Sequence, residues 1–157
     1  MHIGSAKLKI KSTEKIGVDD LLEGFLMLKT KGDYFALMAY IDSDSKNKKL
    51  LNKVRELIRK SMKSAVTVGF GPRFLHSTGQ FHKGGPDKGM FIQFVTEDKN
   101  DLVIPGKNYS FGTLKNAQAI GDYESLVKWK RRVLKVNLGS HVQEGLKKFC
   151  GYLKRVV

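Results

Sequence analysis

Hydrophobic residues follow two patterns along this chain. Four longer segments repeat them every three or four positions, the spacing of a helix that buries one face. Four shorter runs are hydrophobic almost throughout or rich in β-branched residues, which is typical of strands buried on both faces. The predicted helices cover residues 17–31, 47–62, 109–129 and 141–157, and the predicted strands cover residues 33–41, 65–71, 89–97 and 131–138.

Local signals refine the helix predictions. The segment 17–31 has an acidic first turn, which favours a helix because the helix N-terminus carries partial positive charge. Ser110 stands where it can cap the helix 109–129. Gly121 and Asp122 mark a point where we expect that helix to be interrupted.

The order of the elements predicts the fold class. Strands that alternate with helices imply a mainly parallel sheet, because a parallel connection needs a crossover and the crossover is usually a helix. We therefore predict an α/β protein, a three-layer α/β/α sandwich with about four strands, formed by a single domain over residues 1–157. The strand 89–97 is the exception in this order, since a loop rather than a helix precedes it. The three prolines, Pro72, Pro86 and Pro105, all fall in predicted loops.

The chain is strongly basic. Its 157 residues, the length of one ordinary domain, include 29 Lys and Arg against 15 Asp and Glu, a formal charge of +14. Such a charge attracts anions, so nucleic acid and phosphorylated metabolites are both candidate partners. The lysines are scattered along the sequence, however, and composition alone favours a solvated lysine-rich surface. No RNA-binding signature or row of aromatic and Arg residues favours nucleic acid.

The cysteine count and the hydrophobic runs bear on the compartment. Cys150 is the single cysteine, so an internal disulfide is excluded, and its setting LKKFCGYLK is that of a structural thiol in a helix. No hydrophobic run approaches the roughly 20 residues of a membrane span. The start MHIGSAKLKIKS lacks the hydrophobic centre of a signal peptide. We expect a soluble, cytoplasmic protein.

The segment HSTGQFHKGGP, residues 76–86, belongs to a predicted loop over residues 70–88. This loop leaves the carboxyl end of the second predicted strand, and ligands of open α/β sheets bind beyond the carboxyl ends of the strands. It is also longer than most structureless connections, which is more typical of a binding loop. We therefore predict that it binds a ligand.

The composition of this loop indicates what the ligand is. Glycines allow positive φ angles and close approach, so that successive amides can point at one anion. Cations neutralise such an anion, hydroxyl and amide groups bind other hydroxyls, and imidazoles exchange protons near neutral pH. The glycines are Gly69, Gly71, Gly79, Gly84 and Gly85, and the cations are Arg73 and Lys83. The hydroxyl and amide groups belong to Ser77, Thr78 and Gln80, and the imidazoles to His76 and His82. Together they predict a phosphorylated, hydroxyl-rich ligand.

Each feature of the loop also has a simpler explanation. The glycines fit neither the phosphate-loop pattern nor the dinucleotide fingerprint, so they can equally serve turns. His76 and His82 are six residues apart, which matches no common zinc motif, and we expect no metal. Ser77 beside a histidine does not amount to a catalytic triad. The density of polar groups in one loop, rather than any single residue, favours binding.

Three stretches of this sequence resemble a known family. They are AVTVGFGPRFLHSTGQFHKGGPDKGMFIQF at 65–94, IPGKNYSFGTLKNAQAIGDYESL at 104–126 and RRVLKVNLG at 131–139. They resemble the C-terminal part of the bacterial fusion proteins of transaldolase and glucose-6-phosphate isomerase. The resemblance implies a sugar-isomerase fold of the flavodoxin-like type, phosphosugar binding, and a part in interconverting glucose 6-phosphate and fructose 6-phosphate, an aldose-ketose isomerisation of glycolysis and gluconeogenesis.

The same resemblance implies roles for the matching residues. The reaction opens the sugar ring and then moves a proton between C1 and C2 through an enediol, which calls for a base, usually Glu, and for a histidine at the ring oxygen. His76 or His82 would move protons as catalytic residues. The substrate-binding residues would be Gly71, Arg73, Ser77, Thr78, Gly79, Gln80, Lys83 and Gly84. No cofactor is implied.

The chain also departs from this family. The loop contains no Glu, and isomerases of this kind usually build their pocket from two sandwich domains, often with a neighbouring subunit. We find no counterpart of the transaldolase barrel or of the first isomerase domain in this sequence. We therefore expect activity only when a second copy or a separate isomerase half completes the site. The alternative is a non-catalytic module that responds to a phosphosugar or binds nucleic acid.

Overall fold

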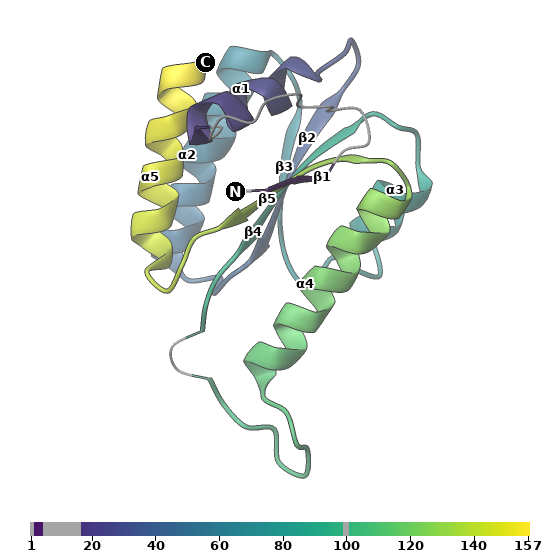
Figure 1. The fold of residues 1–157 in the computed structure, drawn as a ribbon, viewed down its shortest axis with the longest axis vertical. Coiled ribbons are helices and arrows are strands. Elements are labelled where there is room, and N and C mark those ends of the chain that lie inside the picture. Colours follow the sequence, from purple (N-terminus) through teal and green to yellow (C-terminus); the bar gives the residue numbers. More distant parts are fainter. Residues whose placement is uncertain (1, 5–16, 99–100) are drawn as a thin grey trace.

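The computed structural model describes residues 2–4, 17–98 and 101–157 and has an α/β fold (Figure 1). Its strands form one five-stranded sheet in the order β1-β5-β4-β2-β3. The four strands from β2 to β5 run parallel, and β1 is antiparallel to β5. The bounds are His2–Gly4 for β1, Tyr34–Tyr40 for β2, Val66–Phe70 for β3, Gly89–Val95 for β4 and Arg132–Asn137 for β5. The predicted parallel sheet is confirmed, with one short edge strand that we did not predict.

Helices cover both faces of the sheet. Their bounds are Val18–Met27 for α1, Ser45–Met62 for α2, Thr78–Gly84 for α3, Phe111–Lys128 for α4 and Val142–Val156 for α5. Helices α1, α2 and α5 lie on one face, and α3 and α4 lie on the other (Figure 1). The predicted three-layer α/β/α sandwich is therefore confirmed. None of the helices in the described ranges combines the length and the hydrophobicity needed to cross a bilayer.

Each face of the sheet has its own hydrophobic core. Successive residues of a strand point to opposite faces. In β2, Phe35 and Leu37 therefore belong to the larger core beneath α1, α2 and α5, whereas Ala36, Met38 and Tyr40 belong to the smaller core beneath α4. This is why the sequence of β2 is hydrophobic without alternation.

A buried ion pair fixes the amino edge of the sheet. The Arg132 guanidinium donates hydrogen bonds to the Asp33 carboxylate and to the carbonyl oxygens of Leu28 and Asp87. Burial opposes the ionisation of Asp33, but the hydrogen bonds from Arg132 and Thr30 outweigh it and hold its pKa below the usual value. This cluster joins the end of α1, the turn before β4 and the start of β5.

Two predicted boundaries differ from the structure. Helix α1 ends at Met27 rather than at residue 31, because Asp33 accepts a hydrogen bond from the Thr30 amide and Gly32 turns the chain with a φ of 84°. Helix α4 is not interrupted at Gly121 and Asp122. Its Asp122 faces the protein interior, where it has a charged partner. The cap at Ser110 is confirmed, since its hydroxyl accepts a hydrogen bond from the Thr113 amide.

Candidate functional site

The predicted binding loop contains an ordered turn and a short helix. A turn over residues 71–77 follows β3, and the seven-residue helix α3 comes next. The amides of Ser77 and Gly79 both donate to the carbonyl oxygen of Phe74, at 3.1 and 2.8 Å. The Phe74 ring is buried and meets the Tyr40 ring edge to face, with 5.8 Å between the ring centroids. Phe74 therefore anchors the segment to the sheet, and the expectation of a structureless loop is wrong.

The glycines of this segment make room for aromatic rings. A Cβ atom at Gly71 would lie 2.5 Å from the Tyr40 ring, and one at Gly69 would lie 2.9 Å from the Phe74 ring. In the described residues the glycines with positive φ are Gly32, Gly106 and Gly139, all outside this segment. The loop glycines therefore do not use the positive φ that they allow, and close packing explains Gly69, Gly71, Gly79 and Gly85.

The amides of these glycines are also occupied. The amide of Gly71 donates to the carbonyl of Ala39 at 2.9 Å, continuing the pairing of β3 with β2. The Gly79 amide donates to Phe74, and the Gly85 amide donates to the carbonyl of Phe81 at 2.8 Å. We predicted that these amides surround an anion. That prediction is wrong for these three, because each already donates to a backbone carbonyl.

His82 is a buried anchor of α3. It is 5% exposed, its Nδ1 atom lies 3.0 Å from the Tyr34 hydroxyl, and its ring packs against Phe91 with 5.0 Å between centroids. Burial lowers the pKa of His82 below its usual value, although the nearby charge of Asp122 opposes this. The buried His82 ring has little access to a ligand, so packing explains this residue better than the predicted proton transfer does.

Lys83 is committed to an internal ion pair. Its Nζ atom lies 2.6 Å from an Asp122 carboxylate oxygen, and the Asp122 side chain is fully buried. The Tyr40 hydroxyl donates to the other Asp122 oxygen at 3.1 Å. This cluster joins α3, α4 and β2. In it Asp122 compensates the positive charge of Lys83, which was predicted to neutralise a ligand.

Arg131 fixes the other end of the segment. Its Nη2 atom donates to the carbonyl oxygen of Lys83 at 2.8 Å and to that of Gly85, and its Nη1 atom lies 3.5 Å from the Asp87 carboxylate. Arg131 is not among the residues predicted from the sequence. The signal was a pair of arginines at the start of a predicted strand, where a charged side chain is buried only if it has partners.

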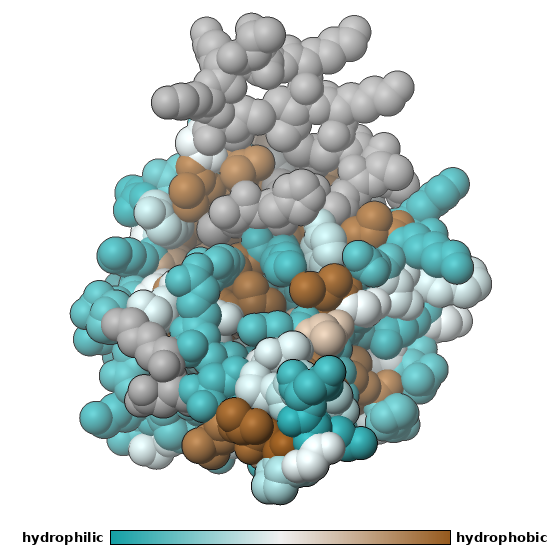
Figure 2. Space-filling model, turned by 60° about the horizontal axis from the view of Figure 1, so that its bottom comes forward, coloured by the Kyte–Doolittle hydropathy of each residue, from teal (hydrophilic) through white to brown (hydrophobic). Residues whose placement is uncertain are grey.

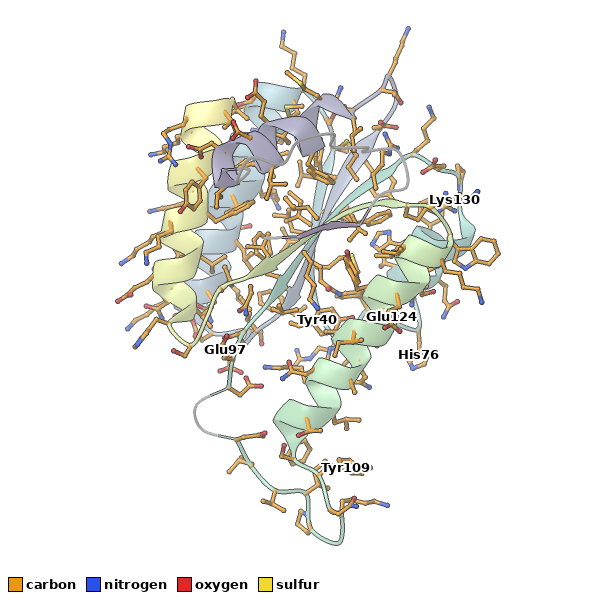
Figure 3. All side chains as sticks on the ribbon, in the orientation of Figure 1. Tyr40, His76, Glu97, Tyr109, Glu124 and Lys130 are labelled. Atoms are coloured by element: carbon orange, nitrogen blue, oxygen red, sulfur yellow. The ribbon has the colours of Figure 1, made fainter. Side chains whose placement is uncertain are left out.

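The remaining predicted site residues of the segment lie at the surface. Arg73, His76, Ser77, Thr78, Gln80 and Gly84 are exposed. Ser77 and Gln80 still donate to the carbonyls of Phe74 and Leu75. Within the described ranges, the side chains of Arg73, His76 and Thr78 have no hydrogen-bond or ionic partner. Figure 3 shows His76 on the outside of the molecule, away from the sheet.

A small cavity lies beneath this turn. It has a volume of about 130 Å³ and is lined by Thr78 and His82 together with mostly hydrophobic residues of β2, β3 and the turn. Pockets that enclose small-molecule ligands usually have roughly 300–1,000 Å³. This cavity is therefore too small to enclose a phosphorylated hexose, and Arg73 and His76 do not line it.

A larger polar cleft, which was not predicted from the sequence, lies at the carboxyl edge of the sheet. It has about 480 Å³ and lies between the end of β5 and the first turn of α5. Figure 3 shows Glu97 at this edge. A neighbouring hollow of about 400 Å³ shares His141 and Glu144 with the cleft. Other polar residues that line the cleft are Asn137, Ser140 and Lys148. The sequence signal was the polar stretch Gly139-Ser140-His141 directly after a predicted strand.

The lysines are less scattered in space than in sequence. Helices α2 and α5 together carry eleven Lys and Arg against two Glu, a net charge of +9. Between them runs a groove of about 670 Å³ whose floor includes Leu50, Leu57 and Cys150. Burial raises the pKa of the Cys150 thiol, as expected for a structural cysteine. Lysines at the rim of this groove are Lys49, Lys53, Lys60, Lys147 and Lys154.

Within the described ranges, the structure contains no group of three or more His, Cys, Asp or Glu side chains that is arranged to hold a metal ion.

Comparisons with known proteins show the fold. No family model matches the sequence, and no curated protein matches it. The structure is similar to the crystal structure of a hypothetical protein from Thermus thermophilus, with a TM-score of 0.75 and 17% sequence identity over 88% of this chain. The match covers 38% of that protein, so this chain corresponds to less than half of its length.

Proposed function

We propose that this chain is a phosphosugar-binding domain related to glucose-6-phosphate isomerase. Its segment 71–84 forms one wall of a pocket for glucose 6-phosphate or fructose 6-phosphate, and a second domain or subunit forms the other. The complete site interconverts the aldose and the ketose. In this proposal Arg73 binds the phosphate, Thr78 binds a sugar hydroxyl, and His76 rather than His82 moves the proton during ring opening.

One observation carries this proposal: free polar side chains stand on a rigid support. Arg73, His76 and Thr78 are exposed and have no partner among the described residues, while Phe74 and the Asp122 cluster fix the backbone that carries them. Because the backbone is already fixed, ligand binding costs side-chain entropy here but little backbone entropy. The cavity beneath them is too small for a hexose phosphate, which supports a site that a second wall completes.

Ligand-induced stabilisation of the purified chain tests the binding part. We expect fructose 6-phosphate and glucose 6-phosphate to raise the melting temperature, and fructose and glucose to leave it unchanged, because binding to the folded state stabilises it by mass action. The variant R73Q should lose this shift. The matched control R55Q removes a partly buried arginine from α2, and it should keep the shift.

A coupled assay for the conversion of fructose 6-phosphate tests the catalytic part. The reaction should be slow or undetectable with the chain alone and should appear when an isomerase half is added. Absence of both turnover and phosphosugar stabilisation would contradict the proposal.

The lysine-rich groove supports a second candidate function. A net charge of +9 on α2 and α5 favours an acidic partner, including nucleic acid. Under this alternative the chain is retained on DNA in a salt-dependent way and shows no response to phosphosugars. The double variant K53E/K147E should then release it, whereas R73Q should not.

A further inference from the structure

The groove between α2 and α5 has a hydrophobic floor. The two helices lie side by side in one outer layer of the sandwich, and the groove between them measures about 670 Å³ (Figure 1). Its floor consists of the half-buried residues Leu50 and Leu57 of α2 and Cys150 and Gly151 of α5. Leu50 and Leu57 are two helical turns apart, so this floor runs along the helix axis. In the described part of the chain the floor remains open to solvent.

Lysines line this floor from both sides. They are Lys49, Lys53 and Lys60 on α2 and Lys147 and Lys154 on α5. Among the described residues, none of these lysines has a hydrogen-bond or ionic partner. Burial raises the pKa of the Cys150 thiol, and the charges of Lys154 and Lys53 oppose this rise. Ammonium groups from both helices therefore lie near the floor.

The acidic residue of the lining does not offset these charges. Glu56 accepts a hydrogen bond of 2.7 Å from Nη2 of Arg59 and lies 3.5 Å from Nη2 of Arg55. Its charge is therefore already compensated. Figure 2 keeps this side of the molecule on the left and shows mainly hydrophilic surface there. The groove thus combines a hydrophobic floor with two rims of uncompensated positive charge.

We infer that this groove binds an acidic amphipathic helix of a partner protein. A helix that binds in a groove places hydrophobic side chains at every third or fourth position onto the floor. Acidic side chains on both flanks of such a helix would face the lysines on both rims, which gives complementary charge. The inference deepens the second candidate function, because it takes the acidic partner to be a protein helix.

The dimensions of the groove suit one short helix. The lining of α2 extends from Lys49 to Lys60, about 17 Å along the helix axis at 1.5 Å per residue. An occupying helix would therefore be in contact over about three turns. At Gly151 a Cβ atom would lie 4.0 Å from Nη1 of Arg155, its nearest neighbour outside the helix backbone. The floor is therefore open at Gly151, where a large side chain of the partner can be accommodated.

The floor distinguishes a protein helix from nucleic acid. Nucleic acid places phosphates against lysines and its bases against polar groups or aromatic rings. Leu50, Leu57 and Gly151 offer neither, and the Cys150 thiol is only a weak donor. Lysine rims alone would attract nucleic acid but would leave the hydrophobic floor unexplained. A second copy of this chain is disfavoured because two such surfaces, each with a net charge of +9, repel one another.

Fluorescence anisotropy with the full chain and a designed peptide tests the inference. The probe is a labelled helix of about four turns, with leucines on one face and glutamates on both flanks. A contact of about three turns is smaller than the roughly 800 Å² that each partner buries in a standard interface, so we expect micromolar binding. A scrambled peptide of the same composition should bind at least about tenfold more weakly.

Substitution of Gly151 by leucine fills the floor without changing the charge. G151L should weaken binding of the probe at least about tenfold. The matched control G121L makes the same change on α4, on the other face of the sheet, where a Cβ atom would meet nothing within 4 Å, and it should leave binding unchanged. Circular dichroism and thermal melting show whether both variants fold.

Charge reversal tests the rims. K53E/K147E changes one lysine on each side of the groove, and K107E/K128E changes two exposed lysines elsewhere by the same total charge. The first variant should weaken binding of the probe at least about tenfold more than the second, because only its lysines face the peptide.

Amide signals of the ¹⁵N-labelled chain locate the bound probe. We expect shifts in residues 49–60 and 147–154. Absence of binding, equal binding of the scrambled peptide, shifts confined to other residues, or full binding by folded G151L would overturn the inference. Salt-dependent retention on a DNA duplex, lost in K53E/K147E and without binding of the probe, would overturn it in favour of nucleic acid.

This inference does not depend on the proposed phosphosugar chemistry. The groove lies on the face of the sheet that α2 and α5 cover, whereas the segment 71–84 leads into α3 on the other face (Figure 1). Binding of the probe without phosphosugar stabilisation, or the reverse, contradicts one proposal and leaves the other.

Discussion

Gly71 lies directly against the ring of Tyr40: a Cβ atom at this glycine would be 2.5 Å from the ring carbon Cε1. The same ring meets Phe74, and its hydroxyl donates to Asp122. Tyr40 thus connects the turn after β3 with α4. The shape of the candidate site depends on this contact.

Substitution of Gly71 by alanine should destabilise the fold. The added methyl group must displace a buried ring, and overpacking of this kind costs about 1–3 kcal/mol of unfolding free energy. Chemical denaturation measures the change. G84A is the matched control, because a Cβ atom at Gly84 meets no atom within 4 Å, and it should change stability by less than about 1 kcal/mol. Equal losses in both variants would contradict the packing role of Gly71.

The buried His82 should make stability depend on pH. Its pKa is lowered in the folded state, whereas in the unfolded chain it takes its ordinary value of 6.5. As the pH falls through 6.5, His82 therefore takes up a proton in the unfolded chain before it does so in the folded protein. The unfolding free energy should fall as pH decreases from about 7 toward 5, by at most about 1.4 kcal/mol per pH unit.

The two histidines of the segment provide a matched comparison. H82Q should remove this part of the pH dependence, and H76Q, which changes an exposed side chain, should retain it. Denaturation curves across the pH range give both slopes. A wild-type slope that H82Q leaves unchanged would show that His82 is not the titrating group.

Replacement of Asp122 by asparagine should loosen the link between α3 and α4. The variant D122N keeps a hydrogen-bond acceptor for Tyr40 but loses the charge that faces Lys83. We expect a loss of about 1–3 kcal/mol in unfolding free energy. E124Q on the exposed side of the same helix should stay within about 0.5 kcal/mol of the wild type. If D122N proved as stable as E124Q, the ion pair would not hold the segment.

Loss of the Arg131 side chain should free the end of the segment locally. In R131Q the carbonyls of Lys83 and Gly85 lose their donor, so amide hydrogen exchange should become faster in residues 82–88 than in the strands. The exposed Arg59, paired with Glu56 on α2, offers the comparison variant R59Q. Unchanged exchange in 82–88 would argue against the anchoring role.

Much of the fold was predictable from the sequence. Strands β2 and β4 are hydrophobic at odd and even positions alike because helices cover both faces, and this pattern is visible without a structure. Helices α2 and α5 each bury one side of a periodic segment. The edge strand β1 was not predictable, since three residues, His2–Gly4, carry too little pattern to indicate a strand.

The candidate site was harder to predict because it depends on distant partners. His82 is buried through Tyr34, 48 residues earlier in the chain, and Lys83 is neutralised by Asp122 from α4. Nothing near residue 82 in the sequence distinguishes such a histidine from an exposed one. A glycine likewise does not show in sequence whether it serves a positive φ or a neighbouring ring, and Gly71 serves a ring.

Helix α3 escaped prediction for a related reason. It has seven residues, of which Gly79 and His82 are buried, so it shows no hydrophobic periodicity. The position of the segment after a parallel strand was predicted, but the exposure of Arg73 and His76 was not. Only the structure shows which of those polar side chains lack a partner in the protein and are free to bind a ligand.

Nuclear magnetic resonance with fructose 6-phosphate tests the central claim most directly. We predict that addition of the phosphosugar to the ¹⁵N-labelled chain shifts the amide signals of residues 71–84, and that R73Q abolishes these shifts while R55Q preserves them. Shifts confined to the groove between α2 and α5 or to the cleft near His141, or no shifts at all, would contradict the claim that this segment binds a phosphorylated sugar.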